Sequence, residues 1–220
     1  MFSPEMINLM WIGLLETLYM TVISTFLAYV IGLPVGILLY VTDQDGIKPN
    51  TAINQIVGGI VNILRSVPFI ILLVAVIPLT RLIVGTSIGS TATIVPLVIA
   101  AAPFVARVVE SSIKEVDRGV IEASLSMGAS PLQVVYKVLI PEATPSLIIG
   151  AAIATTTILG YSAMSGFVGG GGLGTIAINY GYYRSKTDVM LVMVLILVVI
   201  VQIFQEIGTW ISKKSDKRIK

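Results

Sequence analysis

The sequence predicts an all-α, polytopic membrane protein with about five transmembrane helices. Of its 220 residues, 55% are hydrophobic and only 12% are charged, and the mean hydropathy is +0.96. A soluble fold of this size could not bury so much apolar side chain, because small domains expose a large share of their surface. This composition excludes a soluble enzyme, a nucleic-acid-binding domain and a disordered tail.

Two residue types are missing from the chain. The absence of Cys excludes disulfides, thiolate metal ligands and thiol nucleophiles. The absence of His removes the commonest metal ligand and general base. We therefore expect the chain to bind no metal and no cofactor of its own, and its net charge of +2 does not favour a nucleic-acid partner.

Five stretches are long and apolar enough to cross about 30 Å of hydrocarbon, which takes about 20 helical residues. They are residues 17–42, 56–79, 82–106, 143–164 and 189–211. Arg65 interrupts the second stretch, so we expect residues 67–79 to be its membrane-buried part and Arg65 to lie near a bilayer face. Residues 3–13 lack the marks of a removable signal peptide, and we predict an interfacial helix there.

The distribution of Lys and Arg predicts an N-terminus outside and a C-terminus inside the cell. In this orientation the loop of residues 107–137, Lys48, Arg65 and the basic tail are cytoplasmic, which places eleven positive residues inside and three outside. The tail contributes Lys213, Lys214, Lys217, Arg218 and Lys220, and the outside keeps Arg81, Arg184 and Lys186.

The most polar segment is the predicted cytoplasmic loop, residues 107–142. Arg107, Glu110 and Lys114 have helical i,i+3 and i,i+4 spacing, so the third span should continue as a helix into water. We expect Glu115, Arg118 and Glu122 to extend this ladder of charges.

A turn between two helices is predicted within this loop. Gly128 can supply a left-handed residue that ends one helix. Ser130, Pro131 and Gln133 have the pattern of an N-cap, a first helical residue and a capping box. We expect a second short helix over residues 131–139 that ends before Pro141. The pair is either a packed connector between spans or a rigid element that docks on another protein.

The loop also resembles the EAA loop of ABC-importer permeases. The run Glu122-Ala123-Ser124, then Gly128, then Val138-Leu139-Ile140-Pro141 has the family's spacing, with small or isosteric departures at Ser124, Val138 and Ile140. The resemblance implies that this loop couples the chain to an ATPase. The coupling residues that it implies are Glu122, Ala123, Ser124, Gly128, Ile140 and Pro141.

Between about Glu16 and Tyr182 the chain is similar to the methionine-importing permeases of type I ABC importers. The runs that carry this likeness are Gly32-Leu-Pro-Val-Gly36, Arg65-Ser-Val-Pro-Phe69, Ala101-Ala-Pro-Phe-Val105, Gly160-Tyr-Ser-Ala-Met164 and Gly170-Gly-Gly-Gly-Leu-Gly174. The resemblance implies one permease domain, residues 1–220, in a bacterial cytoplasmic membrane. It also implies a second copy of the chain, two ATP-binding subunits, an external substrate-binding lipoprotein, and D- or L-methionine as substrate.

No energy source is evident in the sequence. No Lys directly follows a Gly, so a Walker A loop is absent, and ATP and magnesium would be used by the partner ATPase. Glu16 and Glu206 lie near predicted span ends, which does not favour an ion-coupled mechanism. Residues 169–174 are either a compact turn or a close approach of backbone at an external gate. We expect alternating access driven by the partner ATPase.

A substrate path is harder to read. Tyr161, Ser162, Met164 and Ser165 bring aromatic, hydroxyl and thioether groups to the outer end of the fourth span, although a transmembrane Met usually serves packing. Tyr180, Tyr182 and Tyr183 precede the last span as interface anchors or as substrate contacts. A permease for another small amino acid and an ion-coupled carrier remain alternatives, whereas the lack of His, Cys and paired buried carboxylates argues against a membrane enzyme.

Overall fold

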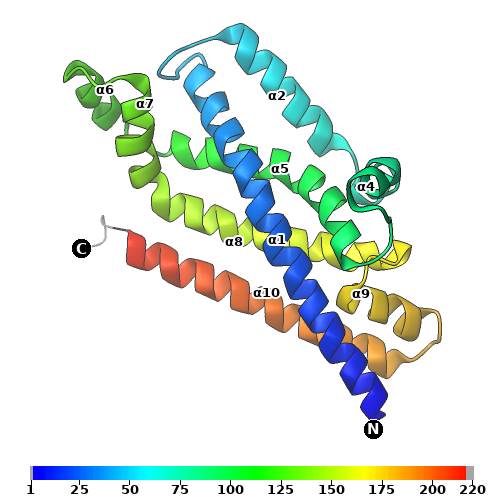
Figure 1. Cartoon of the computed structure of the whole chain (residues 1–220). Coiled ribbons are helices and arrows are strands. Elements are labelled where there is room, and N and C mark those ends of the chain that lie inside the picture. The colour runs from blue at the N-terminus through cyan, green and yellow to red at the C-terminus, as the bar shows by residue number, and fades with distance from the viewer. Residues whose placement is uncertain (1, 217–220) are drawn as a thin grey trace. The chain divides into compact units, whose positions relative to one another are not determined.

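A computed structural model describes residues 2–216, and every regular element within them is a helix (Figure 1). The α-helices are α1 (Pro4–Thr42), α2 (Thr51–Ser66), α3 (Phe69–Ala75), α4 (Ile77–Val84), α5 (Ser90–Lys114), α6 (Arg118–Ser126), α7 (Pro131–Val134), α8 (Ile140–Met164), α9 (Gly172–Ile176) and α10 (Thr187–Ser215). The shorter turns are η1 (Val135–Leu139), η2 (Ser165–Val168) and η3 (Ala177–Tyr182), of which η1 and η3 are π-helical. Lys217, Arg218 and Lys220 of the predicted basic tail lie outside the described residues.

Four helical segments are long and apolar enough to cross a membrane: α1, α5, the continuous helical segment 131–168, and α10. A fifth crossing exists if α2 and α3 count as one span, and these two helices are bent by 99° at their junction. The prediction of about five spans therefore agrees with the described residues, and the second span differs in form from the others.

Residues 3–13 do not form the separate interfacial helix that we predicted. From Pro4 onward they are the beginning of α1, which runs unbroken for 39 residues to Thr42. Its early apolar side chains pack on one core cluster, in which Met10 lies with Leu173, Ile176 and Met193. Packing against protein accounts for the apolar residues on one side of this segment, whereas Ile7, Trp11 and Ile12 remain exposed on the other.

The second span is broken at Pro68. Proline lacks an N–H group and disfavours helix at the residue before it, so α2 ends at Ser66 and α3 begins at Phe69. Arg65 lies in the last turn of α2 and is exposed. The predicted continuous helix through residues 56–79 is therefore wrong.

The third span begins later than predicted. Leu82 belongs to α4, which ends at Gly85 with a left-handed φ of +83°. Gly89 also has a positive φ, of +98°, and α5 starts only at Ser90. Two glycines that can take conformations closed to other residues thus separate α4 from α5.

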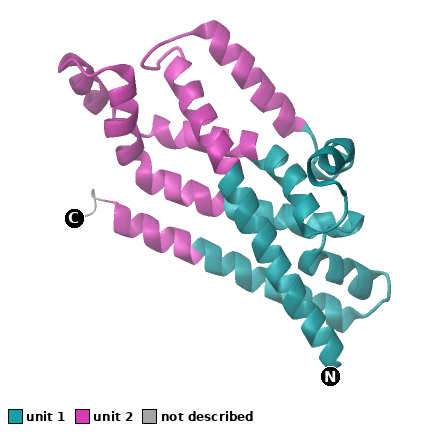
Figure 2. Ribbon diagram, viewed as in Figure 1, with its two compact units in different colours: residues 1–27, 67–101, 154–205 teal, residues 28–66, 102–153, 206–220 magenta. Residues whose placement is uncertain are grey.

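The described chain forms two compact units, and each contains parts of the long helices (Figure 2). Unit 1 comprises residues 1–27, 67–101 and 154–205, and its core cluster includes Met10, Leu159 and Met193. Unit 2 comprises residues 28–66, 102–153 and 206–220, and Leu39, Val61 and Ala106 form a core cluster within it. The predicted coupling loop belongs to unit 2.

Candidate functional site

The polar loop begins with the ion pairs that the spacing predicted. Near the end of α5, Nη1 of Arg107 lies 2.6 Å from Oε2 of Glu110, and Nζ of Lys114 lies 2.9 Å from Oε1 of the same carboxylate. The prediction that α5 extends as a charged helix to Lys114 is confirmed.

The charge ladder does not continue through Glu115, Arg118 and Glu122. The helix stops at Lys114, and Asp117 caps a new helix, α6, by accepting a hydrogen bond of 2.7 Å from the N–H of Gly119. An aspartate N-cap has extended backbone, here with φ −61° and ψ 127°, so the helical spacing on its two sides is out of phase. Our prediction of one continuous ladder was wrong because it did not recognise this cap.

Helix α6 ends as predicted at Gly128, which has a φ of +83°. Its N–H donates to the carbonyl of Leu125 over 2.9 Å, and the N–H of Ala129 donates to the carbonyl of Ser124 over 3.1 Å. This pair of bonds is a Schellman motif, which requires a left-handed residue. The turn therefore depends on a residue that tolerates this conformation, such as glycine.

The capping box at Ser130 is also confirmed. The Ser130 hydroxyl accepts from the N–H of Gln133, and the Gln133 side chain accepts from the N–H of Ser130. Helices α6 and α7 lie side by side (Figure 1). We call residues 118–139 the α6–α7 hairpin.

Pro141 does not end the second helix. The chain passes from α7 through the π-helical turn η1 into α8, which begins at Ile140, and the N–H of Ile140 donates to the carbonyl of Val135 five residues earlier. In an ordinary α-helix a proline ring clashes with the carbonyl four residues before it. The wider π turn accommodates Pro141, so the predicted break is replaced by a continuous helical path.

The motif residues occupy distinct environments in the hairpin. Glu122 and Ala123 are exposed, and within residues 2–216 the Glu122 carboxylate makes no hydrogen bond or ion pair; Asp117, rather than Glu122, caps the helix. Ser124 is buried, and its hydroxyl donates to the carbonyl of Val120 over 2.8 Å. Ile140 is half-buried and Pro141 is exposed. Ser124 thus replaces the second alanine of the family motif with another small residue, and its hydroxyl is hydrogen-bonded within its own helix.

A second organised region is the glycine-rich turn of residues 169–174, in unit 1. Gly169, Gly171 and Gly172 all have left-handed φ values, between 72° and 83°. Thr93 of α5 donates its hydroxyl to the carbonyl of Gly170 over 3.0 Å. The turn is compact and closely approached by neighbouring side chains, which agrees with the first of the two roles considered. A role of its backbone at an external gate stays a prediction.

Helix α1 holds the other side of this turn. The carboxylate of Glu16 accepts from the N–H of Gly172 over 2.6 Å, and the hydroxyl of Thr17 accepts from the N–H of Leu173 over 2.9 Å. A Cβ atom at Gly172 would lie 2.6 Å from Oγ1 of Thr17. Sequence analysis did not predict a contact between Glu16 and this turn, although both lie in the part of the chain that resembles the methionine-importing permeases.

The four candidate residues of a substrate path do not converge on one point. Ser162 and Ser165 are buried, and their hydroxyls donate to the carbonyls of Leu159 and Ser162 over 2.7 and 2.6 Å. Met164 is exposed, and the ring of Tyr161 stacks on Phe69 with centroids 4.5 Å apart. Phe69 is the last residue of the run Arg65–Phe69, which carries part of the family likeness, and that likeness is the sequence feature that marks this residue. The predicted role in transport stays a prediction.

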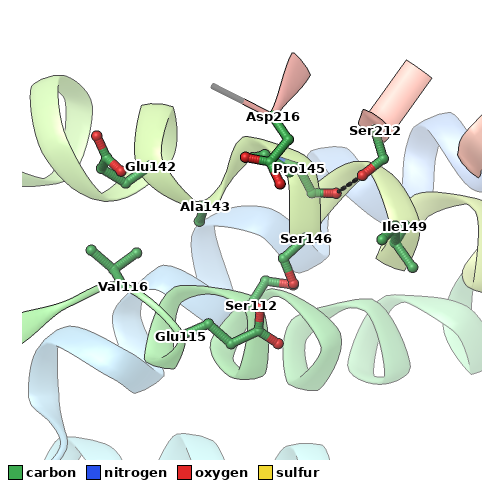
Figure 3. Close-up of a pocket in the computed structure, with 10 residues that line it drawn as sticks. All are labelled: Ser112, Glu115, Val116, Glu142, Ala143, Pro145, Ser146, Ile149, Ser212 and Asp216. Carbon is green, nitrogen blue, oxygen red and sulfur yellow. Dashed lines mark hydrogen bonds between the residues drawn. The ribbon is translucent and has the colours of Figure 1, made fainter. Parts of the chain in front are cut away.

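Unit 2 also contains a cavity of about 320 Å³ between α5, α8 and α10 (Figure 3). Ser112 and Ser146 hydroxyls lie 3.1 Å apart at its wall, and Ser212 donates to the carbonyl of Pro145 over 2.9 Å. These bonds tie the three helices together. Across residues 2–216, no three or more His, Cys, Asp or Glu side chains are grouped so that they could hold a metal ion.

Comparison with protein families and with known proteins identifies the relatives of this chain. The profile of the "Binding-protein-dependent transport system inner membrane component" matches residues 32–220, which is most of the chain. The chain belongs to this family. A "Probable D-methionine transport system permease protein MetI" of Vibrio cholerae serotype O1 is 49% identical over 203 residues, 92% of this chain and 90% of the relative. The "D-methionine transport system permease protein MetI" of Escherichia coli K12 is 56% identical over 161 residues, 72% and 74% of the two chains.

Solved structures of related proteins confirm the all-α permease fold. A chain from "Inward facing conformations of the MetNI methionine ABC transporter" aligns with a TM-score of 0.96 and 51% identity, covering 98% of this chain and 100% of that one. A chain from an amino acid ABC transporter crystallised with histidines aligns with a TM-score of 0.78 at 20% identity, over 96% and 95%, and shows the shared fold alone. The family is a transport component of ABC systems rather than an enzyme.

The α6–α7 hairpin of this permease presents large apolar side chains to solvent. Within the hairpin, Ile121 and Leu139 are buried, whereas Met127, Leu132 and Tyr136 are 80%, 70% and 69% exposed. The EAA motif identifies residues that shape the turn, so the motif did not predict that these three exposed side chains form a surface. They lie on both sides of Gly128 and are the most exposed large apolar residues of the described hairpin, in which Val120 and Leu125 are 43% and 38% exposed. These residues offer apolar surface to a partner.

Proposed function

We propose that this chain is the membrane-spanning permease subunit of an ATP-driven methionine importer. The single observation that carries this proposal is the α6–α7 hairpin, a capped pair of helices with exposed apolar side chains in a chain of this family. Its relatives are named as D-methionine permeases, and a related chain comes from a methionine ABC transporter. The substrate class is therefore D- and L-methionine.

The proposed assembly has two copies of this chain, two ATP-binding subunits and an extracytoplasmic substrate-binding lipoprotein. Magnesium and ATP bind the partner ATPase, because this sequence has no Walker A loop. The solute crosses a bacterial cytoplasmic membrane at or near the two-fold axis of the permease pair. Tyr161, Ser162, Met164 and Ser165 remain candidate contacts for the solute or the gate.

The orientation in this proposal is N-terminus out and C-terminus in. Among the described residues, unit 2 contains Lys48, Arg65, Arg107, Lys114, Arg118, Lys137, Lys213 and Lys214, whereas unit 1 contains Arg81, Arg184 and Lys186. Positive residues concentrate on the cytoplasmic side of membrane proteins. This distribution supports a cytoplasmic α6–α7 hairpin, where an ATPase can reach it.

The coupling step follows from the hairpin's shape. Met127, Leu132 and Tyr136 supply apolar contact area, and the exposed carboxylate of Glu122 offers a hydrogen-bond acceptor. Two capped helices joined by a Schellman turn transmit a displacement instead of absorbing it. Nucleotide-driven closure of the ATPase pair would shift the hairpin and bias the permease between inward-open and outward-open states, provided that nucleotide binds the two states with different affinity.

Reconstitution into liposomes tests the proposal. The permease, its ATPase subunit and a methionine-loaded binding protein should together import methionine, and hydrolysis of ATP should rise with the loaded binding protein. Methionine flux through the purified permease alone would instead indicate an ion-coupled carrier. Import of another amino acid in preference to methionine would retain the coupling scheme and replace the substrate.

A further inference from the structure

Two ion pairs connect the turn after α1 to the two sides of the α5–α6 junction. Nζ of Lys114, the last residue of α5, lies 2.8 Å from Oδ2 of Asp43. Nη2 of Arg118, the first residue of α6, lies 3.2 Å from Oδ2 of Asp45. The turn after α1 therefore spans the three residues between Lys114 and Arg118, with one ion pair on each side of them.

The bridging turn is itself well ordered by hydrogen bonds. Asp43 accepts from the N–H of Gln44 over 2.8 Å through its other carboxylate oxygen. The N–H of Lys48 donates to the carbonyl of Val41, and that of Asn50 donates to the carbonyl of Thr42, each over 3.0 Å. At the start of α2, the amide of Asn54 donates to the carbonyl of Leu39 over 2.7 Å. We call residues 43–50 the α1–α2 strap.

The strap continues into a buried charge network. Glu110 is only 6% exposed, and its carboxylate is shared by Lys114 and Arg107. Nη2 of Arg107 reaches Oδ1 of Asn62 over 2.9 Å and the carbonyl of Gly58 over 3.3 Å, both on α2. A continuous series of polar contacts thus leads from α6 through the strap and α5 to α2.

The two ion pairs differ in their surroundings. The Asp43 and Lys114 side chains are 30% and 47% exposed, whereas those of Asp45 and Arg118 are 75% and 69% exposed. Water screens the second pair strongly, so it contributes little to stability, but it is the ion pair by which the strap contacts α6. Lys114 is also fixed by a buried carboxylate, so Asp43 makes the decisive contact between the strap and α5.

We infer that the α1–α2 strap is a second route of mechanical coupling, in which Asp43 is a positioning residue that makes α1 and α2 move with α6. This inference rests on the proposed ATPase-driven function of the α6–α7 hairpin. The helix is interrupted at residues 115–117, between Lys114 of α5 and Arg118 of α6, so no continuous helix carries a displacement of α6 into α5. Because the strap contacts both sides of this break, the displacement reaches α1 at its end and α2 through Arg107.

The test uses the complete transporter in liposomes, with methionine uptake and ATP hydrolysis measured together. Asp43→Asn keeps the size of the side chain and removes its charge. We expect uptake per ATP to fall by at least about fivefold, within the usual range of coupling effects, while hydrolysis stays within about twofold of wild type. Asp43→Glu should restore most of the coupling. Asp45→Asn removes the ion pair of the strap with α6 and should lower uptake per ATP in the same direction. The matched control is Asp188→Asn, at an exposed carboxylate in the first turn of α10, which should stay within about twofold of wild type.

Two results would overturn the inference. One is an unchanged ratio of uptake to hydrolysis in Asp43→Asn. The other is a proportional loss of uptake and hydrolysis, which would mean that Asp43 only supports folding or assembly.

A second measurement separates this inference from the proposed substrate. The chain has no Cys, so spin labels can be placed at Gln44→Cys and Ser126→Cys, both exposed. If wild-type liposomes import no methionine, the proposed function fails, and the label distance still decides the strap. A narrow distance distribution with and without ATP that broadens in Asp43→Asn supports the strap, and a distribution unchanged by Asp43→Asn overturns it.

Discussion

The carboxylate of Glu16 accepts a hydrogen bond of 2.6 Å from the backbone N–H of Gly172, a residue 156 positions later in the chain. Thr17, the next residue of α1, accepts from the N–H of Leu173. One turn of α1 thus satisfies two consecutive N–H groups at the start of α9. Since α9 has only five residues, this contact, rather than helix length, fixes its first turn.

Removal of the Glu16 carboxylate should destabilise the permease. We expect Glu16→Ala to lower the free energy of unfolding by about 1–3 kcal/mol, because a hydrogen bond to a charged group is lost and the Gly172 N–H is left unsatisfied. Thermal unfolding in detergent measures the change. Glu5→Ala, at an exposed carboxylate in the first turn of α1, is the control. Equal shifts for the two variants would contradict this role of Glu16.

Gly172 should not tolerate a side chain. Its φ is +72°, and an added Cβ would meet Thr17 and Met20, so Gly172→Ala should lower the melting temperature and the yield of folded protein. The matched control is Gly59→Ala in α2, where no atom lies within 4 Å of the added Cβ. Alanine is the better helix former by about 1 kcal/mol, so this control should be neutral or stabilising. Greater damage at Gly59 than at Gly172 would refute the account of the turn.

Gly128→Val should abolish ATP-driven uptake while membrane insertion persists. A β-branched residue is strongly disfavoured at φ +83°, so the Schellman turn cannot form and the hairpin loses its shape. Uptake into liposomes and the amount of membrane-extracted protein are the two measurements. Gly128→Asn should retain much of the activity, because asparagine tolerates the left-handed region. Wild-type uptake by the Val variant would disprove the docking role of the hairpin.

Apolar side chains of the hairpin should contribute to ATPase binding. We expect Met127→Ala and Leu132→Ala each to weaken the binding of the ATPase subunit by about tenfold, which corresponds to about 1.4 kcal/mol. Titration of the purified ATPase against permease in nanodiscs provides the measurement. Ser126→Ala, an exposed neighbour on α6 with little contact area to lose, should bind as wild type does. Unchanged affinity in both apolar variants would exclude this surface as the contact.

The Asp43–Lys114 pair gives a pH dependence with a definite sign. The hydrogen bond from Lys114 lowers the pKa of the Asp43 carboxyl below the ordinary value for aspartate. A lowered pKa in the folded state means that the pair stabilises the fold above the ordinary aspartate pKa of about 3.9, up to the alkaline pH at which Lys114, whose pKa the same hydrogen bond raises, loses its proton. This stabilisation is lost as the pH falls through the lower, folded-state pKa.

Melting temperatures across pH test that sign. The difference between wild type and Asp43→Asn should be constant from about pH 5 to pH 8 and should shrink only in more acidic buffer, below about pH 4. A difference that already changes between pH 6 and pH 8 would contradict the assignment of this dependence to Asp43.

Local patterns of sequence predicted much of the hairpin. The left-handed Gly128, the Ser130 capping box and the ion pairs of Glu110 with Arg107 and Lys114 all form among residues within a few positions of each other. Such interactions depend on backbone geometry that the nearby residues themselves determine. The break at Asp117 was equally local, and it was missed because the charge spacing was read without the cap.

Hydropathy and helix length are properties of single segments, so they were enough to predict an all-α membrane protein with about five spans. Only the tertiary structure decided that residues 4–42 are one helix, that Glu16 holds the turn at Gly172, and that Asp43 reaches Lys114. The two contacts depend on which apolar faces pack together and so bring distant polar groups within hydrogen-bonding range. The spacing of residues along the chain does not predict which of these distant groups come together.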